Sequence, residues 1–298
     1  MKSTRELKRD GFGRAELGRM VRDGRLERVR RGIYDQPAKL DLRANHRRLL
    51  RATLGCCSED AVVSHISAAL LHALPTPHRL LSQVHITRPR AGGGRSSKVL
   101  QVHGLALDPA DVVQVEGYAV TSPARTVVDL ACSLSTADAV AIGDAALRAG
   151  STPSEVLAAL ERAGRRVGLP AARRAVALLD GRSESPGESH SRVLLHEHGV
   201  PAPELQFEVL GPHGLLVGRT DFSWPELRTL GEFDGRVKYG RDLSPDGDLE
   251  QVLFDEKRRE DALRDLGWEI VRWVWSDLRD PAALLERLER AFARGKKR

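Results

Sequence analysis

The sequence predicts a mixed α/β protein of the α+β class, built from three domains. Its first residues show two helix patterns followed by two short strands, and the middle alternates strands with helices. The last part runs in the order helix, three strands, helix, strand. The 298 residues are 41% hydrophobic, which is enough for two or three modest cores. We therefore expect domains over residues 1–51, 52–182 and 183–298.

The N-terminal segment has the pattern of a small winged helix. A capping-box sequence at residues 3–6 begins a short helix, and a second helix is expected over residues 14–23. Three apolar side chains of that second helix share one face, whereas Arg19 and Arg22 lie on the other. Residues 26–34 then read as two short strands around a basic turn. Two helices followed by such a hairpin predict a winged helix.

Basic charge is concentrated at this end of the chain. Residues 1–51 hold 16 Lys and Arg against 7 Asp and Glu, whereas the whole chain has a net charge of +6. Such a patch is typical of a surface that binds nucleic-acid phosphates, although a solvated helical face explains the charge alone equally well. In a winged helix, the second helix would enter the major groove and the basic turn would contact the DNA backbone. The candidate DNA-binding residues are Arg19, Arg22, Arg28, Arg30 and Arg31.

The middle of the chain predicts a mixed α/β domain with a helical linker. Helices are expected over residues 60–74 and 122–134, and two or three amphipathic helices over residues 135–180. The basic, glycine-rich loop at residues 89–97 lacks the Gly-Lys-Ser/Thr ending of a P-loop, so a hairpin tip is the favoured interpretation. Strands are expected at residues 83–87, 99–102 and 112–115.

Three carboxylates are the most informative feature of the last domain. Asp221 falls on its second predicted strand, and Glu232 and Asp234 are two apart on the third, so these two share a face because side chains alternate. Hard cations such as Mg²⁺ take oxygen ligands and keep several waters, so two or three converging carboxylates suffice to bind one. The expected elements are a helix over 187–198, a strand over 205–210, a turn at 211–214, a strand that carries Asp221, a strand over 230–235, a helix over 249–266 and a strand over 268–274.

Several separated motifs of this domain resemble those of a known family. They are Asp-Phe-Ser-Trp-Pro at 221–225, Glu-Phe-Asp-Gly at 232–235 and Leu-Gly-Trp-Glu-Ile-Val-Arg at 266–272. Together with the order of elements, they resemble the domain related to very-short-patch-repair endonucleases within the PD-(D/E)XK nuclease superfamily. The resemblance covers residues 184–290 and implies a restriction-endonuclease-like αβββαβ core.

The resemblance also implies catalytic roles. Glu188 takes the place of the acidic residue on the first core helix, and Asp221 and Glu232 take those of the metal-binding pair. Asp234 stands where the superfamily usually has a lysine that orients the attacking water or stabilises charge on the phosphate. The candidates to take over that role are Lys238, Lys257 and Arg258. The predicted catalytic set is Glu188, Asp221, Glu232, Asp234 and Lys238, with Mg²⁺ or Mn²⁺ as cofactor.

A second resemblance covers residues 2–50. The motif Gly-Arg-Leu-Glu-Arg-Val-Arg-Arg-Gly-Ile-Tyr at 24–34 resembles the N-terminal winged helix of AbiEi-type antitoxins, which belong to type IV toxin-antitoxin systems and repress their own operons. This resemblance implies DNA binding, and it allows a cognate toxin protein as partner without identifying one. Winged helices often act as dimers, so a homodimer also stays open.

Two functions from different classes follow from these resemblances. The first is a metal-dependent endodeoxyribonuclease with its own DNA-binding domain, and we favour it. The second is a non-enzymatic transcriptional repressor or antitoxin that keeps a degenerate nuclease fold. A nuclease directed at RNA is a third and weaker hypothesis.

The remaining residue types predict little chemistry. Three cysteines without a CxxC pair make neither a disulfide framework nor a zinc motif, and they suggest a reducing cytoplasm. The histidines have no zinc-like spacing, so we expect structural or surface roles for them, with His190 the one to watch because it lies two residues from Glu188. The chain has no apolar run of ~18 residues and no signal-peptide pattern, so no membrane partner is expected.

Overall fold

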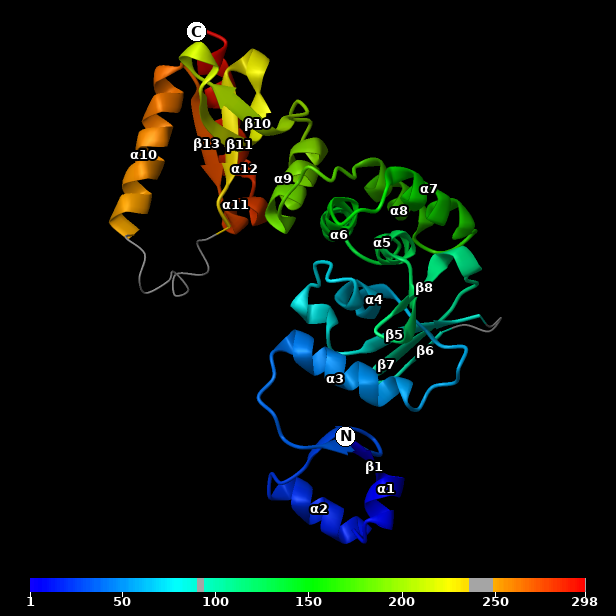
Figure 1. Ribbon diagram of the computed structural model, residues 1–298. Coiled ribbons are helices and arrows are strands. Elements are labelled where there is room, and N and C mark those ends of the chain that lie inside the picture. The colour runs from blue at the N-terminus through cyan, green and yellow to red at the C-terminus, as the bar shows by residue number, and fades with distance from the viewer. Residues whose placement is uncertain (90–93, 236–248, 298) are drawn as a thin grey trace. The chain divides into compact units, whose positions relative to one another are not determined.

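The computed structural model describes residues 1–89, 94–235 and 249–297, with the backbone alone for residues 249–253. The chain divides into two compact units (Figure 1). Unit 1 comprises Met1–Ser135 with Gly150–Val176, and unit 2 comprises Thr136–Ala149 with Ala177–Arg298. The predicted α+β class is confirmed, because helices occur with three separate sheets, antiparallel or mixed.

The N-terminal segment of unit 1 forms the predicted two helices and hairpin. Ser3 caps the first helix, and its side chain and that of Glu6 form the expected capping box. A short strand not expected from the sequence, β1, joins the hairpin to give the strand order β1-β3-β2. The elements are β1 (Lys2–Ser3), α1 (Thr4–Arg9), α2 (Arg14–Arg22), β2 (Glu27–Arg30) and β3 (Ile33–Asp35).

Helix α3 (Leu42–Leu54) crosses the boundary expected at residue 51. Leu49 and Leu50 on this helix are buried in one cluster with Val63 and Val84 of the middle sheet. The helix therefore belongs to the core of the middle sheet. The boundary was predicted too late in the chain because this helix is rich in arginine and has a narrow apolar face. Its composition is therefore similar to that of the basic N-terminal segment.

A six-stranded mixed sheet forms the middle of unit 1, in the order β6-β7-β5-β4-β9-β8. The helix expected over residues 60–74 is helical only in α4, because Val62 and Val63 form a strand between β5 and β9. A short apolar run fits a buried strand or a helix equally well. The strands are β4 (Val62–Val63), β5 (Val84–Arg88), β6 (Arg95–Ser96), β7 (Leu100–Gly104), β8 (Val112–Val115) and β9 (Tyr118–Thr121).

The helices of unit 1 agree with the remaining predictions. Ser122 accepts a hydrogen bond from Arg125 N at the start of α5, with Pro123 in the first helical position. Residues 90–93 of the glycine-rich loop lie outside the described residues, and Arg95 and Ser96 pair with β7. The helices are α4 (His65–Leu71), α5 (Pro123–Ala131), α7 (Pro153–Arg162) and α8 (Leu169–Ala177), with short 3₁₀ turns at His78–Leu80 and Pro109–Asp111.

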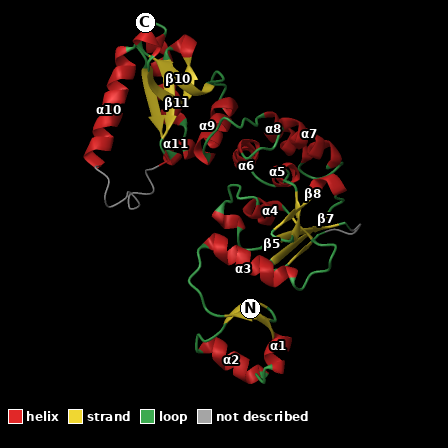
Figure 2. Ribbon diagram, in the orientation of Figure 1, coloured by secondary structure: helices red, strands yellow, loops and turns green. Residues whose placement is uncertain are grey.

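Unit 2 has the predicted order of helix, three strands, helix and strand, which is therefore confirmed (Figure 2). Strands β10, β11 and β12 are antiparallel neighbours, and β13 runs parallel to β12 after the crossover helix α10. The elements are α6 (Thr136–Arg148), α9 (Pro186–Glu197), β10 (Glu204–Leu210), β11 (Leu216–Trp224), β12 (Thr229–Phe233), α10 (Leu249–Asp265), β13 (Glu269–Trp273), α11 (Trp275–Arg279) and α12 (Ala282–Gly295), with 3₁₀ turns at Pro212–Gly214 and Pro225–Leu227.

Two apolar clusters cover the two faces of this sheet. Phe222 and Trp273 pack with side chains of α9 and α12, whereas Leu230 packs with Leu263 of α10. The sheet is thus the middle of three layers. Helix α6 belongs to this unit rather than to a linker, because the Asp144 carboxylate accepts hydrogen bonds from α9.

Candidate active site

Asp221 lies on the face of the sheet that α10 covers. Its neighbours on β11 turn the other way, since Phe222 belongs to the cluster under α9 and α12. The Asp221 Oδ2 atom accepts a hydrogen bond of 2.8 Å from the backbone N–H of Phe233 at the end of β12. The strand pairing thereby fixes this carboxylate, which is largely screened from solvent.

Glu232 joins Asp221 on the same face. Phe222 pairs with Gly231 across β11 and β12, so positions 221 and 232 come opposite each other one step further along the antiparallel pair. Leu230, two residues before Glu232, packs under α10, which confirms the face. The sequence therefore placed these two carboxylates on adjacent strands correctly.

Burial and like charge act together on Asp221. Burial raises the pKa of its carboxyl group to about 6, and the nearby charges of Glu188, Glu232 and Glu184 act in the same direction. The hydrogen bond from Phe233 opposes this rise. Carboxylates that repel each other in a partly desolvated site favour the binding of a divalent cation, because the cation relieves the repulsion.

Glu188 lies in the first turn of α9 and is buried. Its Oε2 atom accepts hydrogen bonds from the Gln206 side chain at 2.9 Å and from Glu184 N at 2.7 Å. Gln206 has a positive φ of 53°, a backbone conformation that residues other than glycine rarely adopt. These contacts hold Glu188 near Asp221, as its predicted role requires.

Two arginines bind Glu232, and the sequence did not single them out. Glu232 Oε1 pairs with Arg259 Nη2 at 2.6 Å, and Glu232 Oε2 pairs with Arg272 Nε at 2.7 Å. Arg272 is the direct neighbour of Glu232 in the parallel pairing of β12 and β13. Both oxygens of Glu232 therefore already have cationic partners, which a metal ion would have to share or displace.

The residues that pair with Glu232 are not Lys257 or Arg258, two of those expected to replace the missing lysine. Lys257 and Arg258 are exposed, and Lys238 lies outside the described residues. Asp234 follows the end of β12, is exposed, and donates its backbone N–H to Trp273 O. The helical pattern does contain a signal for Arg259. It precedes the buried Leu263 by one helical turn and therefore faces the sheet.

A close glycine contact sets the position of α9 beside the site. A Cβ atom at Gly187 would lie 1.9 Å from Phe233 Cε1, and Phe233 is the residue whose N–H holds Asp221. We expect Gly187→Ala to lower the stability of unit 2 by roughly 1–3 kcal/mol, because the ring or the helix must move. Chemical denaturation monitored by tryptophan fluorescence measures the loss. The control Glu226→Ala truncates an exposed side chain of the same unit and should change stability by less than about 0.5 kcal/mol.

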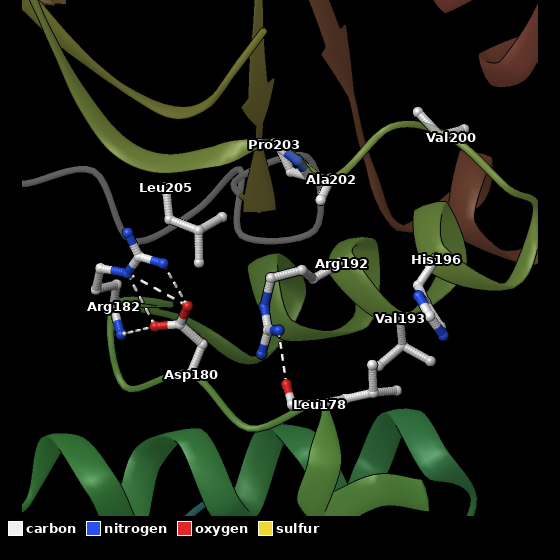
Figure 3. Close-up of a pocket in the computed structure, with 10 residues that line it drawn as sticks. All are labelled: Leu178, Asp180, Arg182, Arg192, Val193, His196, Val200, Ala202, Pro203 and Leu205. Atoms are coloured by element: carbon white, nitrogen blue, oxygen red, sulfur yellow. Dashed lines mark hydrogen bonds and ion pairs between the residues drawn. The ribbon is translucent and has the colours of Figure 1, made fainter.

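A pocket of about 280 Å³ lies on another side of α9 (Figure 3). Its charged groups are already paired, since Arg182 binds Asp180 and Arg192 donates to Leu178 O. None of the three predicted carboxylates lines it. Its lining residues are Leu178, Asp180, Arg182, Arg192, Val193, His196, Val200, Ala202, Pro203 and Leu205.

The five candidate DNA-binding arginines do not share one environment. Arg19, Arg22, Arg28 and Arg31 are exposed. Arg30 instead turns inward, where its Nη1 atom donates to Thr53 O of α3 at 3.3 Å and its Nε atom is buried without a hydrogen-bond partner. Arg30 thus joins the hairpin to α3, and four of the five side chains remain free to contact DNA.

Fold and site together define a two-unit α+β protein whose second unit carries two half-buried carboxylates, Asp221 and Glu232, on a four-stranded mixed sheet. No family model matches the chain. Two Mycobacterium tuberculosis proteins, "Uncharacterized protein MT2308" of strain CDC 1551 / Oshkosh and "Uncharacterized protein Rv2248" of strain ATCC 25618 / H37Rv, are each 34% identical to it over 288 residues. The match covers 95% of this chain and 98% of each relative. The chain belongs to the same protein family as these two.

Within the described parts of the chain, no helix has both the length and the apolar character that crossing a bilayer requires.

Proposed function

We propose that the protein is a Mg²⁺-dependent endodeoxyribonuclease whose N-terminal winged helix binds DNA. The observation that carries this proposal is the meeting of Asp221 and Glu232 on adjacent strands, with Glu188 of α9 beside them, on an αβββαβ core. Oxygen donors of this kind fit Mg²⁺ or Mn²⁺. When bound there, the cation would polarise a phosphodiester oxygen and lower the pKa of a bound water.

The residues of the chain would supply the rest of the chemistry. Asp221 and Glu232 would bind the cation, and Glu188 would accept hydrogen bonds from its water shell. Arg259 and Arg272 fit the role of the absent lysine, because their guanidinium groups lie beside Glu232 and could take up charge that develops on the phosphate. Such fixed cations favour the transition state because they need not reorganise during the reaction.

One experiment tests the proposal directly. Purified wild-type protein is incubated with plasmid, single-stranded and mismatched DNA in Mg²⁺ or Mn²⁺, beside Asp221→Ala. We expect metal-dependent cleavage that falls at least about 100-fold in the variant, because several kcal/mol of transition-state stabilisation depend on the metal. The control Glu226→Ala removes an exposed carboxylate at the turn after β11 and should cleave like wild type. Absence of cleavage by the wild type on every substrate contradicts the nuclease proposal.

A repressor or antitoxin with a degenerate nuclease fold is the second candidate. It is favoured by the two ion pairs of Glu232, which already neutralise the carboxylate that a metal ion needs. Under this alternative, the wild type binds duplex DNA without cutting it, and Asp221→Ala changes nothing. The RNA-directed hypothesis is tested by whether structured RNA competes with a labelled DNA duplex for binding to the protein.

DNA binding itself makes a separate prediction about the hairpin. We expect Arg28→Ala with Arg31→Ala to weaken duplex binding at every sequence and to lower the salt slope by about 2, since each lost phosphate contact removes about 1. Fluorescence anisotropy across a salt series measures both quantities. Arg173→Ala, which removes an exposed arginine of α8, serves as control. An unchanged slope in the double variant would show that the hairpin is not the DNA-binding surface.

A further inference from the structure

Three histidines that are far apart in the sequence meet in unit 1. Across the part of the chain that the structure describes, His65, His85 and His103 form the one group of three or more metal-binding side chains whose ligand atoms all lie within 4.8 Å of one another. The sequence predicts only structural or surface roles for them, because spacing along the chain gives no sign of this meeting.

The sheet brings the histidines together. β5 and β7 are parallel with Thr87 opposite His103, and His85 shares the face of Thr87 because it is two residues away. His65 begins α4 directly after β4, the other neighbour of β5, where Ser64 N donates to His85 O. The backbone of His65 has a φ of 51°, a conformation that costs about 1 kcal/mol or more for such a residue and that often marks a functional site.

One pair of the nitrogen atoms, which is within hydrogen-bonding distance, is spaced almost as in a zinc site. His85 Nδ1 and His103 Nε2 are 3.1 Å apart, and two nitrogens on a tetrahedral Zn²⁺ are about 3.3 Å apart for Zn–N bonds of ~2.0–2.1 Å. His65 Nδ1 lies 3.0 Å from Ser64 Oγ, which leaves its Nε2 atom for a metal. Ser64 Oγ also accepts from Thr87 Oγ1, so a buried hydroxyl pair orients this ring as supporting partners of metal ligands do.

Burial of all three rings disfavours their charged form. Burial lowers the pKa of His85 to about 4, and the neighbouring imidazole of His103 adds to this effect. Burial likewise lowers the pKa of His103 to about 4, and that of His65 falls well below its usual value. Neutral imidazole nitrogens are ligands for Zn²⁺ and other first-row divalent metals.

Two buried polar atoms near the histidines have no hydrogen-bond partner among the described residues. Asp129 is 1% exposed, its Oδ2 atom has no hydrogen-bond partner, and its charge favours the protonated form of His103. Arg166 pairs with the other oxygen of Asp129 at 2.7 Å, while its own Nη2 atom is buried and without a partner. Buried polar atoms that lack a partner are costly.

We propose that His65, His85 and His103 form a second metal site, for Zn²⁺ or a similar first-row divalent ion, separate from the carboxylate site of unit 2. Three imidazoles leave a fourth position for water or a small anion, as in catalytic rather than structural zinc sites. The rings of His65 and His103 are stacked with centroids 3.6 Å apart and 11° between their planes, so one of them turns for both to reach the metal.

The test measures metal binding without any activity. The full chain is stripped with a chelator, and Zn²⁺ is added in isothermal titration calorimetry. We expect one tight Zn²⁺ site per chain with a dissociation constant below about 1 μM, and at least about 100-fold weaker binding in His85→Ala and in His103→Gln. Two controls should bind like wild type, namely His78→Ala, which removes an exposed histidine, and Asp221→Ala, which disables the carboxylate site.

Circular dichroism of the metal-free variants separates lost ligands from lost folding. Co²⁺ supplies a second readout, because its visible ligand-field spectrum reports tetrahedral nitrogen ligation and should be lost in both ligand variants. Equal Zn²⁺ affinity in folded His103→Gln and wild type, or no binding by the wild type, overturns the proposal. A site that disappears in Asp221→Ala but persists in the histidine variants overturns it as well.

Discussion

Asp221→Asn is expected to abolish cleavage and at the same time to stabilise the metal-free protein at pH 7. Burial raises the pKa of Asp221 to about 6, from an ordinary value of 3.8. The folded state therefore binds the proton more tightly than the unfolded chain does, and ionisation of this group destabilises the fold. The asparagine keeps the oxygen that accepts from Phe233 N but carries no charge.

The sign of the pH dependence follows from the same shift. Below about pH 4 the carboxyl group is protonated in both states and costs no stability. As the pH rises through about 6, wild-type stability falls by on the order of 2 kcal/mol, after a reduction for partial exposure of the group. Asp221→Asn lacks this fall, so its advantage at pH 7 should vanish near pH 4.

Denaturant unfolding at several pH values, in chelator and monitored by tryptophan fluorescence, measures this difference. Added Mg²⁺ should then stabilise the wild type and not the variant, because ligand binding to the folded state raises stability. Glu226→Gln changes an exposed carboxylate in the turn that follows β11. The stability of this variant should match that of the wild type at every pH. A variant that is less stable than the wild type at pH 7 would contradict the picture of Asp221 as a strained, ionised ligand.

Arg125→Ala is expected to cost roughly 3–5 kcal/mol of unfolding free energy, because it removes the centre of a buried ion network. Arg125 pairs with Asp111 and with Asp129 at 2.8 Å each, and all three side chains are at most 1% exposed. Arg162 and Arg166 each keep a pair with one of these carboxylates, but neither bridges both. The alanine therefore leaves two buried carboxylates with too little positive charge around them.

Far-UV circular dichroism in urea is the appropriate measurement. All four tryptophans lie in unit 2, so their fluorescence does not report on unit 1. Arg290→Ala removes an exposed pair with Glu286 and should cost less than about 1 kcal/mol. A loss of similar size for the two variants would show that the network of Arg125 contributes little to stability.

The sequence predicted unit 2 well because its signals are local. Gly199 and Gly267 both have positive φ after their helices, as expected of glycines that end a helix, and residues 205–210 alternate apolar and polar side chains. Residues 62–63 were assigned to a helix because two apolar residues before an apolar helix carry no period of their own. The pairing of β4 with β5 and β9 is a long-range contact that no local pattern contains.

The candidate sites show the same limit. Asp221 and Glu232 were found because strand alternation fixes which side each carboxylate faces. Arg272 was missed because it reaches Glu232 only through the parallel register of β12 and β13, which the chain does not encode locally. The three histidines were missed for the same reason, since they meet only when β4, β5 and β7 form one sheet.

The carboxylate site is tested most directly by a crystal of the protein soaked in Mn²⁺, with anomalous scattering used to locate the ion. The proposed function predicts an anomalous peak bound by Asp221 and Glu232, with Arg259 or Arg272 moved off at least one oxygen of Glu232. No peak there at the Mn²⁺ concentration used in the cleavage assay, with both ion pairs of Glu232 intact, would contradict metal-dependent hydrolysis at this site.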